Sequence, residues 1–187
     1  MKAKIPIRDN VLYELFDKNG DRKLFYSHNK LGRFLFTHFG LDFKSRLFGG
    51  MGYSMNIANL VTYTGFAFVT ARMISDSTEA LVSYIALGTG GATTPAETQT
   101  TLVAEIAAGG GLGRTVAALS RVTTNVLATN DTAQLLKLFS VTSTATISET
   151  GIFNASSAGT MVARQTFTGV PVSSGDTFQV TWKLQVN

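Results

Sequence analysis

The sequence contains no cysteine among its 187 residues. This absence excludes disulfide bonds, thiolate nucleophiles and cysteine-based metal sites together. It is compatible with a reducing cytosol or with an assembly that does not depend on redox state, so it names no compartment. Charged residues are also few, at 15%, whereas hydrophobic residues make up 44%. This balance excludes disorder for the chain as a whole and predicts one domain of ordinary size with a buried core.

Long apolar runs are also missing. The opening MKAKIPIRDN starts basic and becomes charged again without an apolar stretch, so it does not predict a secretory signal. The stretch 47–71 carries no charge, but its asparagine, threonine and glycine residues make it too polar for a membrane-spanning helix. From Asn59 to Ile74 the chain is rich in β-branched and aromatic residues. This composition predicts a buried strand over about 60–70.

Residues suited to catalysis are scarce. The histidines, His28 and His38, have neither a cysteine partner nor the HExxH spacing of a zinc site, and the serines lack a GxSxG motif. A glycosidase needs a carboxylate pair. The candidate carboxylates lie in turn-like sequences or beside strand runs, which predicts turn-forming, solvated or interfacial positions: Asp131, Asp176, Glu105 and Glu149. The sequence therefore predicts no enzyme, cofactor or metal site.

The sequence near residue 20 matches a calcium-binding loop only in part. Asp17, Asn19 and Asp21 match the first three ligand positions of such a loop. However, Arg22 stands where the sharp-turn glycine is required, and His28 stands where the bidentate glutamate is required. We interpret VLYELFDKNGDRKLFYSH instead as a hairpin, because its Asn-Gly pair suits a tight primed turn.

The glycine-rich stretch YIALGTGGATTPAETQTTL begins at Tyr84 and raises the question of phosphate binding. A dinucleotide fingerprint needs a third glycine three positions after Gly90, and a P-loop needs Gly-Lys-Ser/Thr. Thr93 and Pro95 occupy that region instead. We therefore interpret GTGGATTPAETQTT as a long loop between strands, and AAGGGLGR at 107–114 as a second loop. Both are candidates for subunit contacts.

The net charge of +4 is unevenly distributed. Residues 1–55 hold ten Lys/Arg against five Asp/Glu, whereas the remainder holds six against seven. The first 55 residues also carry ten of the nineteen aromatic residues. This asymmetry predicts two units: a basic, aromatic-rich N-terminal docking arm over 1–55 and a β-sandwich domain over 56–187.

Within the predicted arm, basic residues alternate with aromatic ones. As a docking arm, it would place aromatics in pockets of a partner protein and cations against an acidic surface. The same pattern is compatible with single-stranded nucleic-acid binding, with an interfacial membrane segment, or with phenylalanines that only complete a local core. The docking interpretation is favoured, and its candidate residues are Phe25, Tyr26, Lys30, Arg33, Phe34, Phe36, Phe39, Phe43, Arg46 and Phe48.

The remaining sequence predicts about eight short strands. In TFQVTWKLQV, at 177–186, apolar and polar residues alternate strictly, which predicts that Trp182 is buried and Thr181 is solvated. Other candidate strands are 81–88, 100–107, 115–128, 133–142, 145–153 and 160–169, although 133–142 also fits a helical stripe. Turn signals at near-regular spacing predict a mainly β, antiparallel, jelly-roll-like β-sandwich after an extended or hairpin arm.

An ordered set of segments carries a resemblance. NLVTYTG at 59–65, YIALGTGG at 84–91, TTLVAEI at 100–106, ISETGIFN at 147–154, GTMVARQTF at 159–167 and SGDTFQVTWKLQV at 174–186 are similar to small virion structural proteins of tailed bacteriophages. The resemblance covers about 59–187 and implies a β-rich particle component. It brings no functional-site motif, and the basic aromatic segment lies outside it.

These observations predict a non-enzymatic phage virion protein that cements or decorates the capsid. Its expected partners are the major capsid protein, or another virion protein, and further copies of itself, with a trimer favoured by analogy. It would assemble in the host cytoplasm and reside on the capsid surface. A membrane is not expected as a partner, and nucleic acid is disfavoured. The alternatives are a tail, neck or fibre component and a carbohydrate-binding module that contacts the host.

Overall fold

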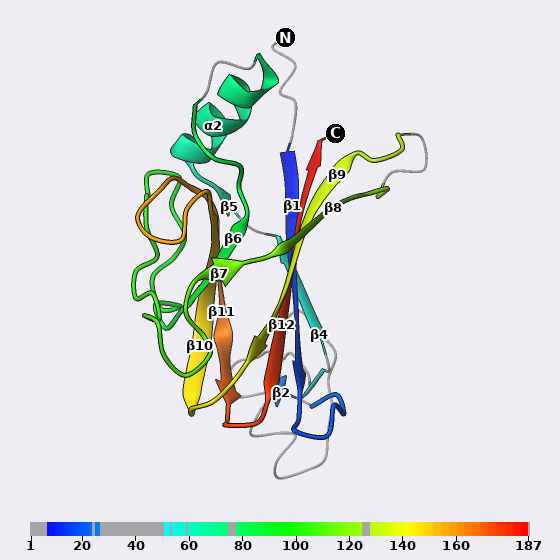
Figure 1. Cartoon of the computed structure of the whole chain (residues 1–187), viewed down its shortest axis with the longest axis vertical. Coiled ribbons are helices and arrows are strands. Elements are labelled where there is room, and N and C mark those ends of the chain that lie inside the picture. The colour runs from blue at the N-terminus through cyan, green and yellow to red at the C-terminus, as the bar shows by residue number, and fades with distance from the viewer. Residues whose placement is uncertain are drawn as a thin grey trace.

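The computed structural model describes residues 7–23, 25–26, 51–52, 54–58, 60–74, 78–124 and 128–186. They form two five-stranded antiparallel sheets packed face to face, which confirms the predicted mainly β sandwich (Figure 1). Sheet 1 has the order β4-β1-β12-β9-β8, and sheet 2 has the order β5-β11-β10-β6-β7.

The strand bounds are as follows. Sheet 1 consists of β1 (Ile7–Phe16), β4 (Ser54–Ala58), β8 (Ala118–Val122), β9 (Thr132–Ser140) and β12 (Thr177–Val186). Sheet 2 consists of β5 (Leu60–Val61), β6 (Tyr84–Gly88), β7 (Thr115–Val116), β10 (Ala145–Phe153) and β11 (Met161–Val172). A separate two-stranded sheet pairs β2 (Phe25–Tyr26) with β3 (Met51–Gly52), and helix α2 spans Tyr63–Met73.

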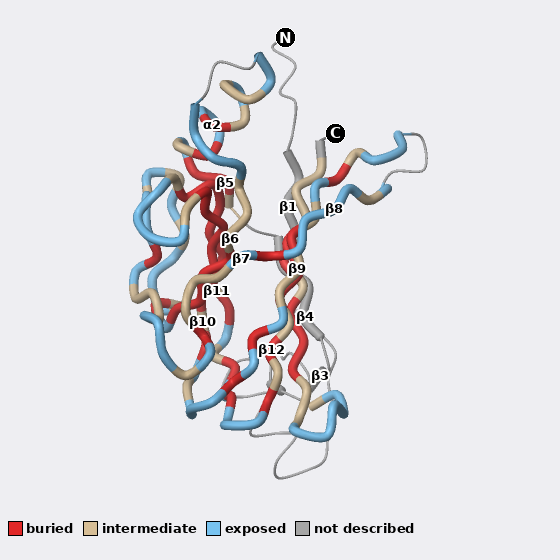
Figure 2. Tube along the Cα trace, viewed as in Figure 1, coloured by how far each residue is buried: buried red, intermediate tan, exposed pale blue. Residues whose placement is uncertain are grey.

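The core lies between the two sheets (Figure 2). Trp182 is fully buried, as the alternation in β12 predicts, and its Nε1 donates to Thr150 Oγ1 at 3.4 Å. Thr181 points to the other face of the sheet, yet only 5% of its surface is exposed, so the prediction that it is solvated is wrong. It lies opposite Leu12 of β1 and Leu136 of β9, so both of its cross-strand neighbours on the central strand β12 are large apolar residues.

The segment predicted as a buried strand over about 60–70 is instead mostly helix α2. Strand β5 covers only its first two residues. Thr62 then caps the helix, because its hydroxyl accepts a hydrogen bond from Gly65 N and donates to Met161 O. Gly65 lies so close to Val162 of β11 that a Cβ there would meet the Val162 carbonyl oxygen. A cap and a close helix–sheet contact thus override the local preference for a strand.

The remaining strand predictions are largely confirmed. The predicted strand 145–153 coincides with β10, 160–169 falls in β11 apart from its first residue, and 81–88 contains β6. The ambiguous segment 133–142 is a strand as far as Ser140, because β9 pairs with β12 from Thr132 to Ser140. Residues 115–128 hold two short strands separated by Ala117. The predicted strand 100–107 is wrong, because this segment forms only the single bridge Glu105–Gly88 within a loop.

The proposed boundary at residue 55 divides a sheet. Strand β1 lies between β12 and β4 and pairs with both. Its residues Val11, Tyr13 and Leu15 are buried in the core. Residues 7–16 therefore belong to the sandwich, and the prediction that they form an arm outside it is wrong. Both sides of β1 are occupied by strands from later in the sequence, which local composition does not reveal.

A turn does follow β1, but the predicted primed type is wrong, because such a turn needs a positive φ at Asn19 and only Gly20 of the pair has one. Gly20 adopts a φ of 85°, and Asp17 Oδ1 accepts hydrogen bonds from the N–H groups of Asn19 and Asp21. The carboxylate of Asp17 thus serves this turn. The return strand is limited to the bridge Phe16–Arg22 and a hydrogen bond from Lys23 N to Leu15 O, since β4 and β12 flank most of β1.

Candidate functional site

The glycine-rich loop after β6 is held by a buried ion pair. Arg164 and Glu149 lie 2.7 Å apart, with side chains 1% and 0% exposed. The Glu149 carboxylate also accepts hydrogen bonds from the backbone N–H groups of Gly90, Val103 and Ala104. The expectation that Glu149 is solvated or interfacial is therefore wrong, since both ends of the loop supply its hydrogen bonds.

Arg164 completes this attachment. Its guanidinium donates to Gly90 O, Thr93 O and Gln99 Oε1. Gly90 has no room for a side chain, because a Cβ there would clash with Glu149 Oε1. The glycines of GTGG thus allow the backbone to approach a carboxylate of the same chain. This finding supports the interpretation of the segment as a structural loop.

A second attachment joins the loop 107–114 to the end of β10. Arg114 donates to both carboxylate oxygens of Glu105 and lies over the Phe153 ring at 3.6 Å from its centroid. Its guanidinium also donates to the carbonyl groups of Ala155 and Ala158. Glu105 is thus an ion-pair partner within the chain, where the sequence predicted a solvated or interfacial position.

Asp131 and Asp176 occupy turns, as predicted. Asp176 Oδ2 accepts a hydrogen bond from Ser173 N and pairs with Lys23 at 2.7 Å. Asp131 accepts hydrogen bonds from Thr124 N and Gln185 Nε2. Each of the acidic side chains that sequence analysis considered for a glycosidase thus makes an ion pair or hydrogen bonds within the chain. Within the described ranges, no group of three or more His, Cys, Asp or Glu side chains gathers as a metal site.

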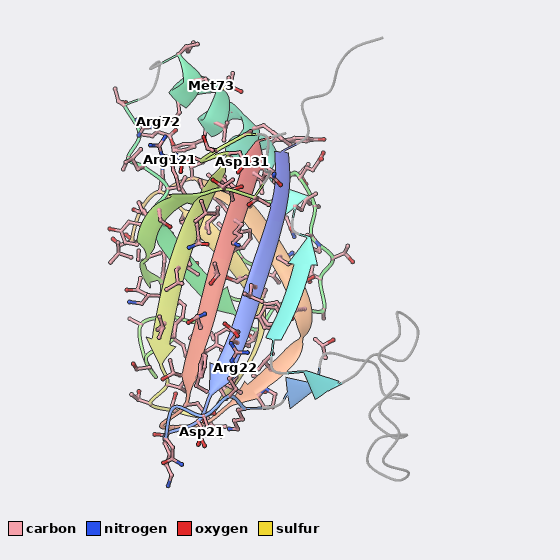
Figure 3. The ribbon with its side chains drawn as sticks, turned by 90° about the vertical axis from the view of Figure 1, so that its right-hand side faces the viewer. Asp21, Arg22, Arg72, Met73, Arg121 and Asp131 are labelled. Atoms are coloured by element: carbon pink, nitrogen blue, oxygen red, sulfur yellow. The ribbon has the colours of Figure 1, made fainter. Side chains whose placement is uncertain are left out.

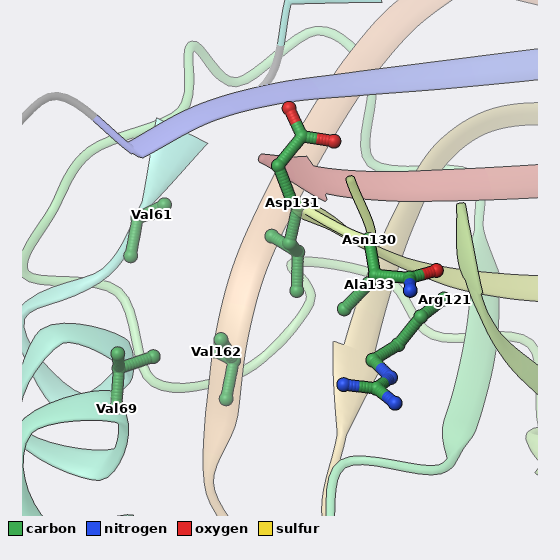
Figure 4. Close-up of a pocket in the computed structure, with 8 residues that line it drawn as sticks. Val61, Val69, Arg121, Asn130, Asp131, Ala133 and Val162 are labelled. Atoms are coloured by element: carbon green, nitrogen blue, oxygen red, sulfur yellow. The ribbon is translucent and has the colours of Figure 1, made fainter. Parts of the chain in front are cut away.

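A pocket of about 290 Å³ opens where the two sheets separate at one end of the sandwich. Its walls come from helix α2, from β5 and β11 of sheet 2, and from β8, β9 and β12 of sheet 1 (Figure 4). The lining is mainly aliphatic, with three polar side chains: Val61, Val69, Val162, Ala133, Leu184, Arg121, Asn130 and Asp131. Such a lining fits an apolar group, with charged and amide side chains beside it. Sequence analysis missed this pocket, since no motif marks it.

Helix α2 presents an apolar surface beside the pocket. Tyr63, Phe66, Met73 and Ile74 are all exposed, the last two by 79% and 70%. A hydrogen bond to Glu97 raises the pKa of the exposed Tyr63 phenol above its ordinary value. Figure 3 shows Met73, Arg121 and Asp131 at this end of the molecule, opposite the turn that carries Asp21 and Arg22.

Of the predicted docking residues, the structure describes the backbone of Phe25 and Tyr26 alone. Phe25 and Tyr26 form β2, whose backbone pairs with Gly52 and Met51 of β3. The other predicted docking residues lie outside the described part of the chain: Lys30, Arg33, Phe34, Phe36, Phe39, Phe43, Arg46 and Phe48. The pairing of β2 with β3 nevertheless defines where their segment is attached. The residues that flank the segment 27–50, Tyr26 and Met51, pair with each other, so this segment, here called the insertion, connects two paired strands.

No helix among the residues that the structure describes is long and apolar enough to span a membrane. Comparisons with protein-family models, with curated proteins and with solved structures returned no match.

Proposed function

We propose that this protein is a non-enzymatic structural component of a tailed-phage virion, most simply a capsid cement or decoration protein. The resemblance of residues 59–187 to small phage virion proteins supports this role. So does the fold, in which the internal ion pairs fasten long loops to a β-sandwich. Its partners would be the major capsid protein, or another virion protein, and further copies of itself.

The single observation that carries the docking proposal is the pairing of β2 with β3. Segment 27–50 holds four Lys/Arg against one Asp and five phenylalanines. Its flanking residues, Tyr26 and Met51, pair directly across antiparallel strands and are thus about 5 Å apart. The sandwich would present this segment to an acidic, pocketed partner surface, where phenylalanines anchor and cations steer the approach.

Two other roles remain candidates. A tail, neck or fibre component would use the same insertion on a different virion protein. A carbohydrate-binding module would present aromatic rings on the outside of its sandwich. Full burial of Trp182 supports the virion role over the carbohydrate role, because the only tryptophan of the chain is withdrawn from the surface.

The proposal is tested with virus particles that lack this protein. Wild-type protein is added beside a variant in which a short Gly-Ser linker replaces residues 27–50, and bound copies are measured by sedimentation. We expect the variant to lose binding. A variant with Phe34, Phe36 and Phe39 changed to Ala should bind at least about tenfold more weakly, since each buried phenylalanine contributes about 1.5–3 kcal/mol.

A matched variant with Lys30, Arg33 and Arg46 changed to Gln separates the contribution of the cations to binding from that of the phenylalanines. It should slow association and reduce the salt dependence of binding, but weaken binding less than loss of the phenylalanines does. If the linker variant is folded and binds as well as wild type, the insertion is not the anchor. If the wild-type protein binds no particle, the capsid role itself is wrong.

A further inference from the structure

Among the described residues, strand β8 is an edge of sheet 1. Residues 118–122 pair with β9 on one side, and no described strand pairs with the other side. Their side chains are exposed at four of the five positions. An edge strand directs alternate N–H and C=O groups away from its sheet and so offers a template for one more strand.

The features that normally protect an edge are weak on β8. Sheet 2 ends in β5 and β7, which have only two residues each, and such short edges limit pairing. Strand β8 has five residues, and it contains no proline or lysine. Its register with β9 is continuous and shows no bulge. The one charge on the strand is that of Arg121.

An apolar side chain on this edge is incompletely covered. Leu119 lies directly opposite Leu135 of β9 and therefore faces the same side of the sheet. Leu135 is buried in the core, whereas Leu119 is 50% exposed. Val116, just before the crossing between the sheets, is also exposed. In Figure 1 the strands β8 and β9 reach away from sheet 2 at this end.

We infer that β8 pairs with β8 of a second copy, antiparallel about a two-fold axis at Ser120. In this register Leu119 lies opposite Arg121 of the partner subunit, and Ala118 lies opposite Val122 of the partner subunit. The two arginines do not face each other, so the pairing avoids like-charge repulsion. The neighbouring strand covers Leu119, and the two copies of sheet 1 become one continuous sheet.

The contact is isologous, which is the commonest symmetry of homo-oligomers. A five-residue strand buries less than the roughly 800 Å² per partner of a stable interface, so the dimer forms in a concentration-dependent manner. This inference does not rest on the virion role. A failure of self-pairing would leave particle binding by the insertion untouched, and the reverse also holds.

The absence of cysteine makes a direct test possible. Ser120→Cys places two thiols at the proposed axis, where Cα atoms about 4.5–5.5 Å apart suit a disulfide. Ser157→Cys, in the exposed loop between β10 and β11, is the matched control. Under mild oxidation of the full chain, we expect Ser120→Cys to give at least about tenfold more linked dimer than Ser157→Cys.

A second pair of variants tests the same edge without cross-linking. Leu119→Lys places a charge on the edge, whereas Leu138→Lys places one on β9 at a similarly exposed site, 48% against 50%. Sedimentation velocity of folded protein should show dimer dissociation constants about tenfold higher for Leu119→Lys and nearly unchanged for Leu138→Lys. A wild-type protein that stays monomeric overturns the inference. The inference is also overturned if the protein forms an oligomer that Ser120→Cys does not cross-link and Leu119→Lys does not weaken. A trimer built from head-to-tail β8–β4 contacts would be such an oligomer.

Discussion

At the scale of single residues, Tyr13 is a tyrosine whose side chain points into the core of the sandwich. Its ring stacks on Phe167, with centroids 4.3 Å apart, and lies 6.0 Å from Phe178. The residue is fully buried, and burial raises the pKa of its phenol well above the ordinary value. The ionised form is disfavoured because the core offers little solvation to a phenolate.

This burial predicts a loss of stability in alkali. The pKa of Tyr13 is higher in the folded state than in the unfolded state, where it is about 10. The contribution of this buried phenol to the unfolding free energy is therefore fully present below pH 10 and is lost as the pH rises above 10. Above pH 10 the unfolding free energy should fall by about 1.4 kcal/mol per pH unit from this group. Urea unfolding of wild type and Tyr13→Phe between about pH 8 and pH 11 measures the slope.

In Tyr13→Phe this part of the slope should vanish. Tyr63→Phe is the control, because the Tyr63 phenol is exposed and its pKa is raised mainly by its hydrogen bond to Glu97. The Tyr63 variant should keep nearly the whole alkaline slope. Equal slopes for wild type and Tyr13→Phe would show that ionisation of this buried phenol does not destabilise the fold.

At the scale of elements, the loop 88–105 behaves as part of sheet 2 despite its irregular backbone. Its N–H groups at Gly90, Val103 and Ala104 donate to Glu149 on β10. Arg164 on β11 neutralises that carboxylate and bonds to the loop from the other side. A regular strand would have satisfied these groups by ladder bonds, whereas here one ion pair does so.

Removal of one charge should therefore affect the whole loop. Glu149→Gln leaves Arg164 buried without a counter-charge and should lower the unfolding free energy by about 3–5 kcal/mol. Hydrogen exchange should also accelerate at the N–H groups of Gly90 and Ala104. Urea unfolding and amide exchange by NMR measure the two effects.

The matched control is Glu105→Gln. It also removes a carboxylate from an ion pair, but the Glu105 side chain is partly exposed. Its loss of stability should be clearly smaller, because solvent screens and replaces part of the interaction. If the two variants lose the same stability, burial of the Glu149–Arg164 pair does not determine its contribution.

At the scale of the whole molecule, the two ends of the chain meet in one sheet. Strand β1 pairs with β12 from Ile7–Val186 to Phe16–Thr177. The segment 27–50, by contrast, connects the paired strands β2 and β3. Two deletions that remove basic aromatic sequence should consequently have opposite effects on folding.

A chain that begins at Asn56 lacks β1 and should fail to fold, because the core loses Val11, Tyr13 and Leu15 and β12 loses its neighbour. The variant with a short linker in place of residues 27–50 should keep the sandwich. Fluorescence of Trp182, the only tryptophan, reports the core in both chains. A folded, cooperatively melting chain from Asn56 would show that β1 is dispensable. An unfolded linker variant would assign the phenylalanines of the insertion to a shared core.

The sequence alone determined the mainly β class, the bounds of β10 and the buried position of Trp182. These features depend on period-two alternation and on local turn residues. Both signals are contained within a few consecutive residues of the sequence. The turn at Gly20 was predictable for the same reason, since Asp17 and Gly20 satisfy it locally. The pocket, in contrast, is formed by side chains from five strands and a helix, and no short motif encodes it.

Only the tertiary structure decided the remaining features. Helix α2 forms in a strand-like sequence because Thr62 caps it and Gly65 packs against β11, about a hundred residues later. Glu149 is buried because Arg164 lies beside it and three loop amides point at it. The boundary near residue 55 failed because β1 finds its partner at the other end of the chain. Local patterns determine which residues prefer a strand, whereas strand pairing and charge burial depend on which distant segments meet.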